Sequence, residues 1–302
     1  MELALKSFWP VVDRSWKSMR AGCDDASCHN TRLMRYIPGG RAGIQSGGHW
    51  YCSVDCFVRA SRAELASLSD VYISEIPRIP RMSMGLTLLA KGYLDAGAMR
   101  LAQTESDLRR ENFEETLIRL DLISEKQLAA ARAAQWGYPV LAPDRIGQEV
   151  ESDIPEYLLQ YSSSVPLQYS VKAKRILLGF VFGVDHSLLE SIEKITGCRA
   201  VPCFITPTEL AEQVKRIAAS PNRKETVIED AGAPERMSRT VGRFAVEVAA
   251  DHAVFSRCKN HVWVRVSGRR GKVDIIFRFE GLGTAEVLEN LQFRQESGSS
   301  FR

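Results

Sequence analysis

The sequence predicts an α+β multidomain protein. Four of the seven cysteines lie between positions 23 and 56, which marks a separate cysteine-rich segment. Two stretches between positions 85 and 135 repeat one helical pattern at an offset of 29 residues. From position 165 onward, strand-like runs alternate with helical patterns. Together these observations predict repeated helical pairs plus a small α/β lobe, followed by a C-terminal α+β module with an antiparallel hairpin.

Composition limits the class of protein. The 302 residues allow two or three domains of roughly 100–150 residues each. With 45% hydrophobic and 25% charged residues, the chain is neither collagen-like, disordered nor a disulfide scaffold. The formal net charge of +3 is too small to indicate nucleic-acid binding by itself.

The cysteine-rich segment has the spacing Cys23-x4-Cys28 and Cys52-x3-Cys56. Two close pairs of thiolates supply the four tetrahedral ligands that Zn²⁺ requires. The Gly-rich run between the pairs predicts a hairpin, and FVRASRAELASL after the last cysteine predicts a helix whose N-terminus favours thiolates. This order of elements resembles a treble-clef zinc finger. The resemblance implies a structural Zn²⁺ bound by these four cysteines.

Two alternatives remain open for this segment. His29 or His49 lies near enough in sequence to replace one cysteine as a ligand. A disulfide is the other alternative, which a reducing cytoplasm disfavours. The remaining cysteines, Cys198, Cys203 and Cys258, are expected to be buried and chemically inert.

The repeated helical pairs occupy residues 85–103 and 114–135. Each unit has an apolar pair, a break at Gly92 or Asp121, and then a second apolar stripe. Asp95 and Ser124 stand where an N-cap belongs, immediately before the second helix of each unit. We therefore expect two helix–turn–helix pairs packed on each other.

Strands and helices alternate in the next region. Residues 165–169, 175–182 and 198–206 are strand-like, whereas 184–197 and 207–218 carry helical patterns that end at Gly197 and begin at Pro207. This alternation predicts the small α/β lobe.

The C-terminal region changes character again. A stretch rich in Pro, Gly, Ala and charge predicts a linker, and residues 235–253 show one apolar helical face. Strands are expected at 253–258, 261–266 and 272–279, the last two joined by the turn SGRRG.

These patterns divide the chain into seven expected segments. They are an N-terminal extension (1–22), a zinc finger (23–69), a two-repeat helical subdomain (70–140), an α/β subdomain (141–218), a linker (219–236), an α+β module (237–294) and a tail (295–302).

Residues 81–218 carry a series of short motifs in a characteristic order. They include GLTLLAKGYL at 85–94, LIRLDLISEKQL at 117–128, GYPV at 137–140 and LLGFVFGVD at 177–185. The region resembles the N-terminal (MshEN-like) domain of type II secretion and type IV pilus assembly ATPases. The resemblance implies a domain that docks on a protein partner of a secretion, pilus or signalling system.

One branch of that family binds cyclic di-GMP, and the resemblance implies a corresponding candidate site in this chain. The candidate ligand-binding residues are Arg81, Gly85, Gly92, Arg110 and Gln135. The chain departs from the pattern, because Ser83 stands at the expected Arg position and acidic side chains replace other motif residues. Loss of cationic donors weakens the case for a dianionic ligand.

No catalytic motif is present. The chain lacks G-x-x-x-x-G-K-[ST], so it lacks the family's ATPase motor, and it also lacks G-x-S-x-G and H-E-x-x-H. It shows no targeting segment and no run of about 18 apolar residues. We therefore expect a cytoplasmic, non-catalytic interaction or regulatory protein without membrane insertion. The alternatives are a cyclic dinucleotide receptor and a zinc-finger nucleic-acid-binding or metal-responsive factor.

Overall fold

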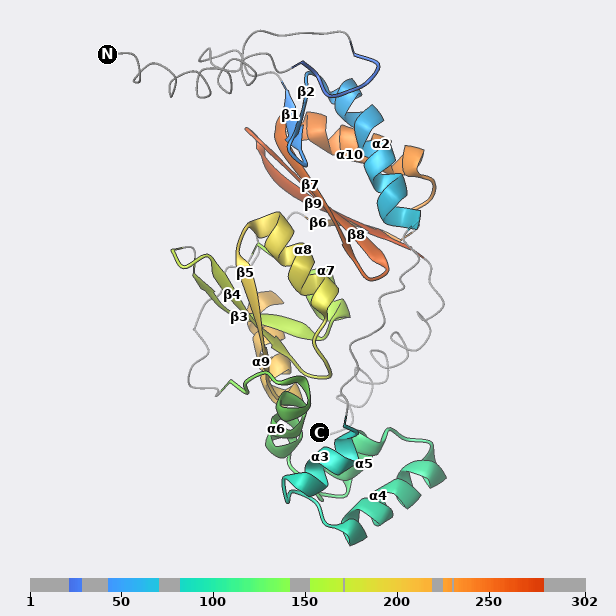
Figure 1. Cartoon of the computed structure of the whole chain (residues 1–302), viewed down its shortest axis with the longest axis vertical. Helices are drawn as coiled ribbons and strands as arrows, with labels where there is room; N and C mark the ends of the chain where they lie inside the picture. Colours follow the sequence, from blue (N-terminus) through green and yellow to red (C-terminus); the bar gives the residue numbers. More distant parts are fainter. Residues whose placement is uncertain are drawn as a thin grey trace, which may run out of the picture. The chain divides into compact units, whose positions relative to one another are not determined.

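A computed structural model describes residues 22–28, 43–70, 82–141, 153–170, 172–218, 225–229 and 231–279. The chain is α+β and divides into two compact units (Figure 1). The discontinuous unit joins Met1–Tyr72 to Lys224–Arg302, and the central unit is Ile73–Arg223. Within the described ranges, no helix combines the length and apolar composition that a membrane span requires.

The discontinuous unit is built on a six-stranded sheet of order β2-β1-β7-β8-β9-β6. Its strands are β1 (Ile44–Ser46), β2 (His49–Tyr51), β6 (Glu225–Ile228), β7 (Ala250–Cys258), β8 (His261–Gly268) and β9 (Gly271–Arg278). Strands β7, β8 and β9 form the predicted antiparallel hairpin, extended by a third strand. Strand β1 joins β7 in parallel, and β6 joins β9 in parallel.

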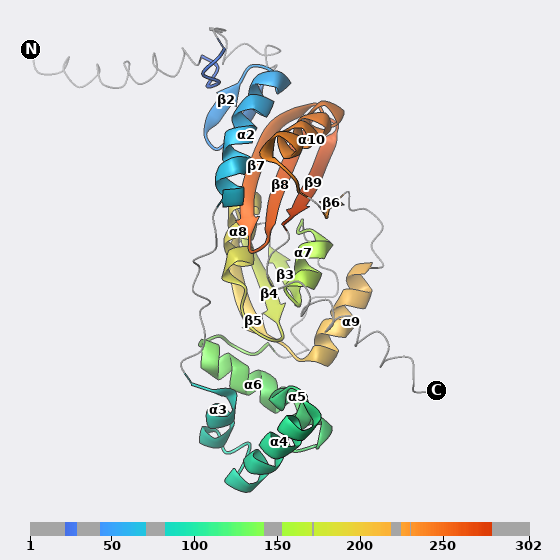
Figure 2. The same ribbon diagram turned by 90° about the vertical axis from the view of Figure 1, so that its right-hand side faces the viewer.

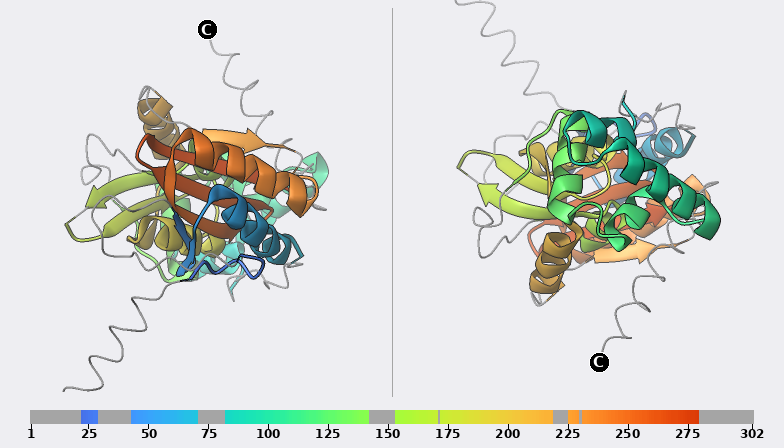
Figure 3. Two further views of the ribbon diagram at one scale, coloured as in Figure 1. Left: turned by 90° about the horizontal axis from the view of Figure 1, so that it is seen from above. Right: turned by 90° about the horizontal axis from the view of Figure 1, so that it is seen from below.

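Two helices cover one face of this sheet. Helices α2 (Val54–Asp70, blue) and α10 (Pro234–Glu247, orange) lie side by side across the strands (Figure 3, left). The strands present alternate side chains to them, because successive residues of a strand point to opposite faces. Val262, Val264 and Val266 of β8 are fully buried in the same core as Phe57 and Leu65 of α2.

This arrangement differs from the predicted organisation, in which the cysteine-rich segment and the C-terminal module are separate. Gln45 pairs with His252 and Ser46 with Ala253, so β1 continues the C-terminal sheet. Strands β1 and β2 have only three residues each and cannot bury a core of their own. Strand β6 also lies inside the predicted linker 219–236. The helix expected over residues 235–253 is shorter, since α10 ends at Glu247 and Ala249 adopts a left-handed conformation (φ 51°) before β7.

The central unit begins with four short helices (Figure 2). They are α3 (Met84–Ala90), α4 (Ala96–Arg109), α5 (Phe113–Arg119) and α6 (Glu125–Trp136). Their N-caps are Ser83, Asp95, Asn112 and Ser124, each accepting a hydrogen bond from a backbone N–H in the first turn. The starts of α3 and α5 lie 29 positions apart, as do those of α4 and α6. Each pair is broken by a residue of positive φ, Gly92 (68°) or Asp121 (54°).

The second part of the central unit is a three-stranded sheet with flanking helices. Its elements are α7 (Glu156–Tyr161), β3 (Ser164–Ser170), β4 (Arg175–Phe180), α8 (His186–Thr196), β5 (Arg199–Phe204) and α9 (Pro207–Ala218). Strand β3 is antiparallel to β4, and β4–α8–β5 is a parallel crossover. The predicted strands and helices of this region agree with the structure to within two residues at each end. Buried Arg132 of α6 donates a hydrogen bond to the Val181 carbonyl (2.6 Å) and pairs with Glu114, which ties the helices to this sheet.

Candidate metal centre

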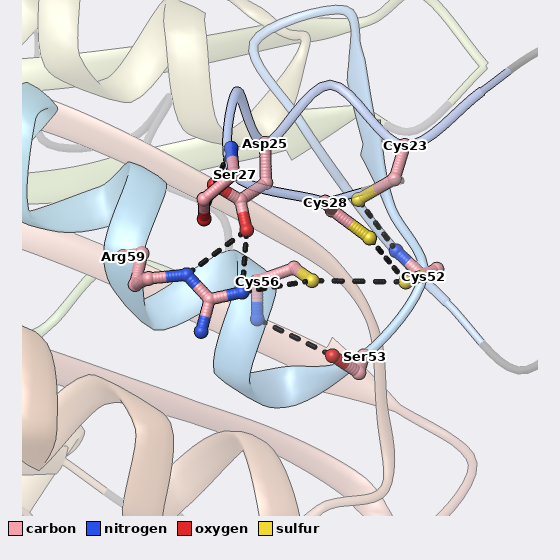
Figure 4. Close-up of polar contacts among 8 residues, drawn as sticks. All are labelled: Cys23, Asp25, Ser27, Cys28, Cys52, Ser53, Cys56 and Arg59. Carbon is pink, nitrogen blue, oxygen red and sulfur yellow. Dashed lines mark hydrogen bonds and ion pairs between the residues drawn. The ribbon is translucent and has the colours of Figure 1, made fainter. Parts of the chain in front are cut away.

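Four cysteine sulfurs of the discontinuous unit converge on one point (Figure 4). The Sγ atoms of Cys23, Cys28, Cys52 and Cys56 all lie within 4.8 Å of one another. The Sγ–Sγ distance is 3.6 Å from Cys28 to Cys52 and 3.7 Å from Cys52 to Cys56. A tetrahedral Zn²⁺ with Zn–S bonds of about 2.3 Å requires Sγ–Sγ edges of about 3.8 Å. The donor set and its spacing therefore fit a tetrathiolate metal ion.

The same distances exclude the disulfide alternative among these cysteines. A disulfide bond is about 2.05 Å long, and all four residues are free thiols at much larger separations. His49 is not part of the cluster. Its side chain is exposed, and its Nδ1 lies 3.7 Å from Oδ2 of Asp24. His29 lies outside the described residues.

Backbone hydrogen bonds place the two cysteine pairs against each other. The Cys28 N–H donates to the Asp25 carbonyl (2.9 Å), which closes the turn that carries the first pair. The Asp24 N–H donates to the Trp50 carbonyl (2.9 Å), and the Trp50 N–H donates to the Asp24 carboxylate (2.6 Å). These bonds join the turn to β2, so that the first pair lies beside the residue that follows that strand.

The second pair lies at the start of α2. Cys52 directly follows β2, and Cys56 occupies the first turn of the helix. The Cys52 N–H donates to the Cys23 sulfur (3.4 Å), and the Cys56 N–H donates to Oγ of Ser53 (3.3 Å). The first of these bonds favours thiolate at Cys23, and the positive end of the helix dipole favours thiolate at Cys56.

Burial affects the charge that this cluster can carry. Burial, followed by the hydrogen bonds to Cys28 and Cys56, raises the pKa of the Cys52 thiol from 9.0 to about 12. The Cys52 thiol is therefore neutral at neutral pH unless a positive charge lies beside it. Because metal binding requires deprotonated sulfur, a divalent ion would supply that charge and release protons.

Two further side chains of the site escaped the sequence analysis, Asp25 and Arg59. The Arg59 guanidinium donates to Asp25 and to the Cys56 sulfur. That contact holds the pKa of the buried Asp25 carboxyl at about 2, against the opposing effect of desolvation. Their positions in the sequence could have indicated both residues. Asp25 lies between the first two cysteines, and Arg59 lies one helical turn after Cys56.

The other three cysteines lie away from the cluster. Cys198, Cys203 and Cys258 are buried. The Cys203 thiol donates to the Leu178 carbonyl (3.4 Å), and burial raises its pKa to about 12.

The residues predicted for a cyclic dinucleotide have roles in the local fold of the central unit. Gly85 allows Met99 and Phe113 to pack closely, since a Cβ there would lie 3.3 Å from the Met99 sulfur. Gly92 and Arg110 both adopt left-handed conformations at helix ends. Gln135 donates to the Met82 carbonyl (2.7 Å), and Arg81 lies outside the described residues.

The fold and the site thus define an α+β protein with a candidate tetrathiolate metal centre in its discontinuous unit. No protein-family model matches the chain, and no curated protein does. Solved structures similar to it include MshE with cdg (17% identity, TM-score 0.37), covering 45% of this chain and 99% of that one. The N-terminal domain of XpsE is also similar (20% identity, TM-score 0.34), covering 44% of this chain and 92% of that one. These similarities agree with the expected resemblance of residues 81–218 to an MshEN-like domain.

Proposed function

We propose that this chain is a non-catalytic interaction protein. In this proposal a structural Zn²⁺ on Cys23, Cys28, Cys52 and Cys56 organises the discontinuous unit. The central unit docks on a protein partner of a secretion, pilus or signalling system. The observation that carries the proposal is the convergence of four sulfurs within 4.8 Å.

A structural role for the metal follows from the number of ligands. Four protein thiolates complete the tetrahedral shell of Zn²⁺ and leave no position for water or substrate, whereas catalytic zinc keeps one position open. The order of elements supports a treble-clef arrangement. The turn with the first pair is followed by the β1–β2 hairpin, and the second pair opens α2.

Metal analysis of the full chain tests the zinc site. We expect one zinc per chain by inductively coupled plasma mass spectrometry, and loss of that zinc in Cys52→Ser. Cys203→Ser is the matched control, because this thiol is buried in the central unit and has no part in the cluster. A wild-type chain that purifies folded and free of metal would overturn the proposal.

The docking function is supported by apolar side chains on the outside of the central unit. Leu101 and Leu108 of α4 are 51% and 73% exposed. They lie seven residues apart, about two helical turns, and so share one face of the helix. Exposed leucines of this kind suit the apolar surface of a protein partner.

A capture experiment tests this face. Full chain with an affinity tag is compared with the double variant Leu101→Lys, Leu108→Lys, and with Gln103→Lys, which changes an exposed residue of the same helix. We expect the proteins captured by the wild type to be lost in the double variant and kept in the control. Equal capture by all three chains would refute docking through α4.

Cyclic di-GMP binding has less support in this chain. A solved structure of MshE contains cdg, but here the described candidate residues serve helix packing and helix ends. Glu114 of the second helical pair also engages the Arg132 guanidinium, so that this cation is already paired within the fold. We expect isothermal titration of the full chain with cyclic di-GMP to give no saturable heat. Saturable heat that is lost in Gln135→Ala would establish the receptor function instead.

A further inference from the structure

We infer that the Asp25–Arg59 pair positions the cysteine ligands and slows release of the metal. Neither residue is a ligand itself. The inference rests on the zinc site proposed above. It extends that site to an ion pair that connects the turn carrying the first two cysteines to the helix carrying the fourth.

The geometry of the pair joins two separate parts of the site (Figure 4). Nε and Nη2 of Arg59 lie 3.0 and 2.6 Å from Oδ2 of Asp25. The same Nη2 lies 3.3 Å from the Cys56 sulfur. One guanidinium therefore contacts the turn between Cys23 and Cys28 and also a candidate ligand on α2.

The carboxylate of Asp25 is held on its other side as well. Its Oδ1 accepts hydrogen bonds from the N–H (3.2 Å) and the hydroxyl (3.0 Å) of Ser27. Both oxygens are thus engaged, and the side chain is only 7% exposed. A buried carboxylate without a cationic partner is costly, so Asp25 requires the Arg59 guanidinium.

Charge gives the pair its effect on the metal. A Zn²⁺ with four thiolates carries a net charge of −2, and the Asp25 carboxylate adds a further negative charge nearby. In the described part of the chain, the Arg59 guanidinium is the cation in contact with the cluster, and its N–H donor withdraws charge from the Cys56 sulfur. Without it, repulsion between Asp25 and the thiolates would favour opening of the turn and release of the metal.

An ordinary surface ion pair would not have this effect. The Arg59 side chain is 52% exposed, and exposed ion pairs contribute little to stability. The distinguishing feature is that one nitrogen is shared between the carboxylate and the sulfur. Arg62 offers a matched comparison, because it lies one turn further along α2 and pairs with Glu235 without touching the cluster.

The test measures zinc release from the full chain to the chromogenic chelator 4-(2-pyridylazo)resorcinol. We expect Arg59→Gln to weaken zinc retention by roughly 10- to 100-fold, the usual effect of removing a hydrogen-bond partner of a metal ligand. Asp25→Asn is expected to weaken it to a smaller extent, because it loses the pairing but also removes the repulsive charge. Arg62→Gln should release zinc at the wild-type rate.

Two further measurements separate positioning from loss of the fold. Arg59→Lys keeps the charge but cannot span both partners, so it should fold normally and still release zinc faster than the wild type. In the Co²⁺-substituted chain, Arg59→Gln should shift the sulfur-to-cobalt charge-transfer band while the tetrahedral d–d bands persist. Wild-type release rates in both Arg59 variants, or equal acceleration in Arg62→Gln, would overturn the inference. A wild-type chain that binds no zinc would instead overturn the proposed function.

Discussion

Removal of the metal should unfold strands that lie some two hundred positions away in the sequence. Strand β1 pairs with β7, and α2 contributes Phe57 and Leu65 to the core that covers β7–β9. Chelation, or Cys52→Ser, releases the turn and the start of α2 and so loosens Ile44, Phe57 and Leu65 together. These three side chains are 2%, 0% and 0% exposed. At about 1.5–3 kcal/mol each, their loss amounts to roughly 5–9 kcal/mol. That is comparable with the whole stability of a typical domain.

Hydrogen exchange measured by mass spectrometry checks this expectation directly. With zinc removed, amides of β8 should lose protection along with those of β1 and β2. Strand β4 of the central unit is the internal control and should keep its protection, because it belongs to a different sheet. If β1 and β2 lose protection while β8 keeps it, the cysteine-rich segment is an independent module and the reasoning fails.

Three further predictions follow from single side chains. Gly242→Ala places a Cβ 2.4 Å from Val58 Cγ2, where α10 meets α2, and should lower the free energy of unfolding by about 1–3 kcal/mol. An unchanged midpoint in denaturant unfolding would show that the two helices can separate freely. Arg132→Met removes the partner of Glu114 and the hydrogen bond to the Val181 carbonyl, and should lower the free energy of unfolding by about 3–5 kcal/mol. The double variant Arg132→Met, Glu114→Gln should recover part of that loss in the same denaturant assay. If the double variant recovers no stability, the hydrogen bond to the Val181 carbonyl accounts for most of the loss. Because burial raises the pKa of Cys203 from 9.0 to about 12, iodoacetamide should leave this thiol unmodified in the native chain at pH 9. The folded state keeps this proton while the unfolded state loses it, so the contribution to stability is complete below pH 9 and declines as the pH rises toward 12. Rapid native labelling of Cys203 at pH 9 would contradict its burial.

Local sequence patterns were sufficient to predict many of the helices, strands and candidate metal ligands of this chain. Asp95 and Ser124 could be recognised as N-caps because a short polar side chain before an apolar stripe satisfies free N–H groups within one turn. The four cysteines could be grouped because metal ligands of this kind occur as close pairs in sequence. The elements of residues 165–218 were predictable because period-2 and period-3.6 patterns alternate there without interruption.

Long-range pairing left no such local signal. Gln45 and His252 are neighbours in the sheet, but the three residues of β1 (Ile44–Ser46) do not specify a parallel partner so distant in sequence. Strand β6 is short and lies in a charged, Pro- and Gly-rich stretch, so its composition indicates a linker although it pairs with β9. Arg59 was missed for a related reason. A polar residue on a helix is usually solvated, and only the fold brings it to both Asp25 and the Cys56 sulfur.

The order of the two units along the chain gives a physical reason why a metal would be useful in this fold. The discontinuous unit is completed only when segments on either side of Ile73–Arg223 come together. Closing a loop of roughly 150 residues costs about 4 kcal/mol in chain entropy. Among the residues that the structure describes, strand pairing between the two segments consists of Gln45 with His252 and Ser46 with Ala253. The burial of α2 must therefore offset most of that cost, and it does so only if α2 and the β1–β2 hairpin are already fixed relative to each other. A Zn²⁺ bound between the turn, the end of the hairpin and the first turn of α2 would fix these elements before they meet the C-terminal strands. It would thereby lower the entropy that remains to be lost.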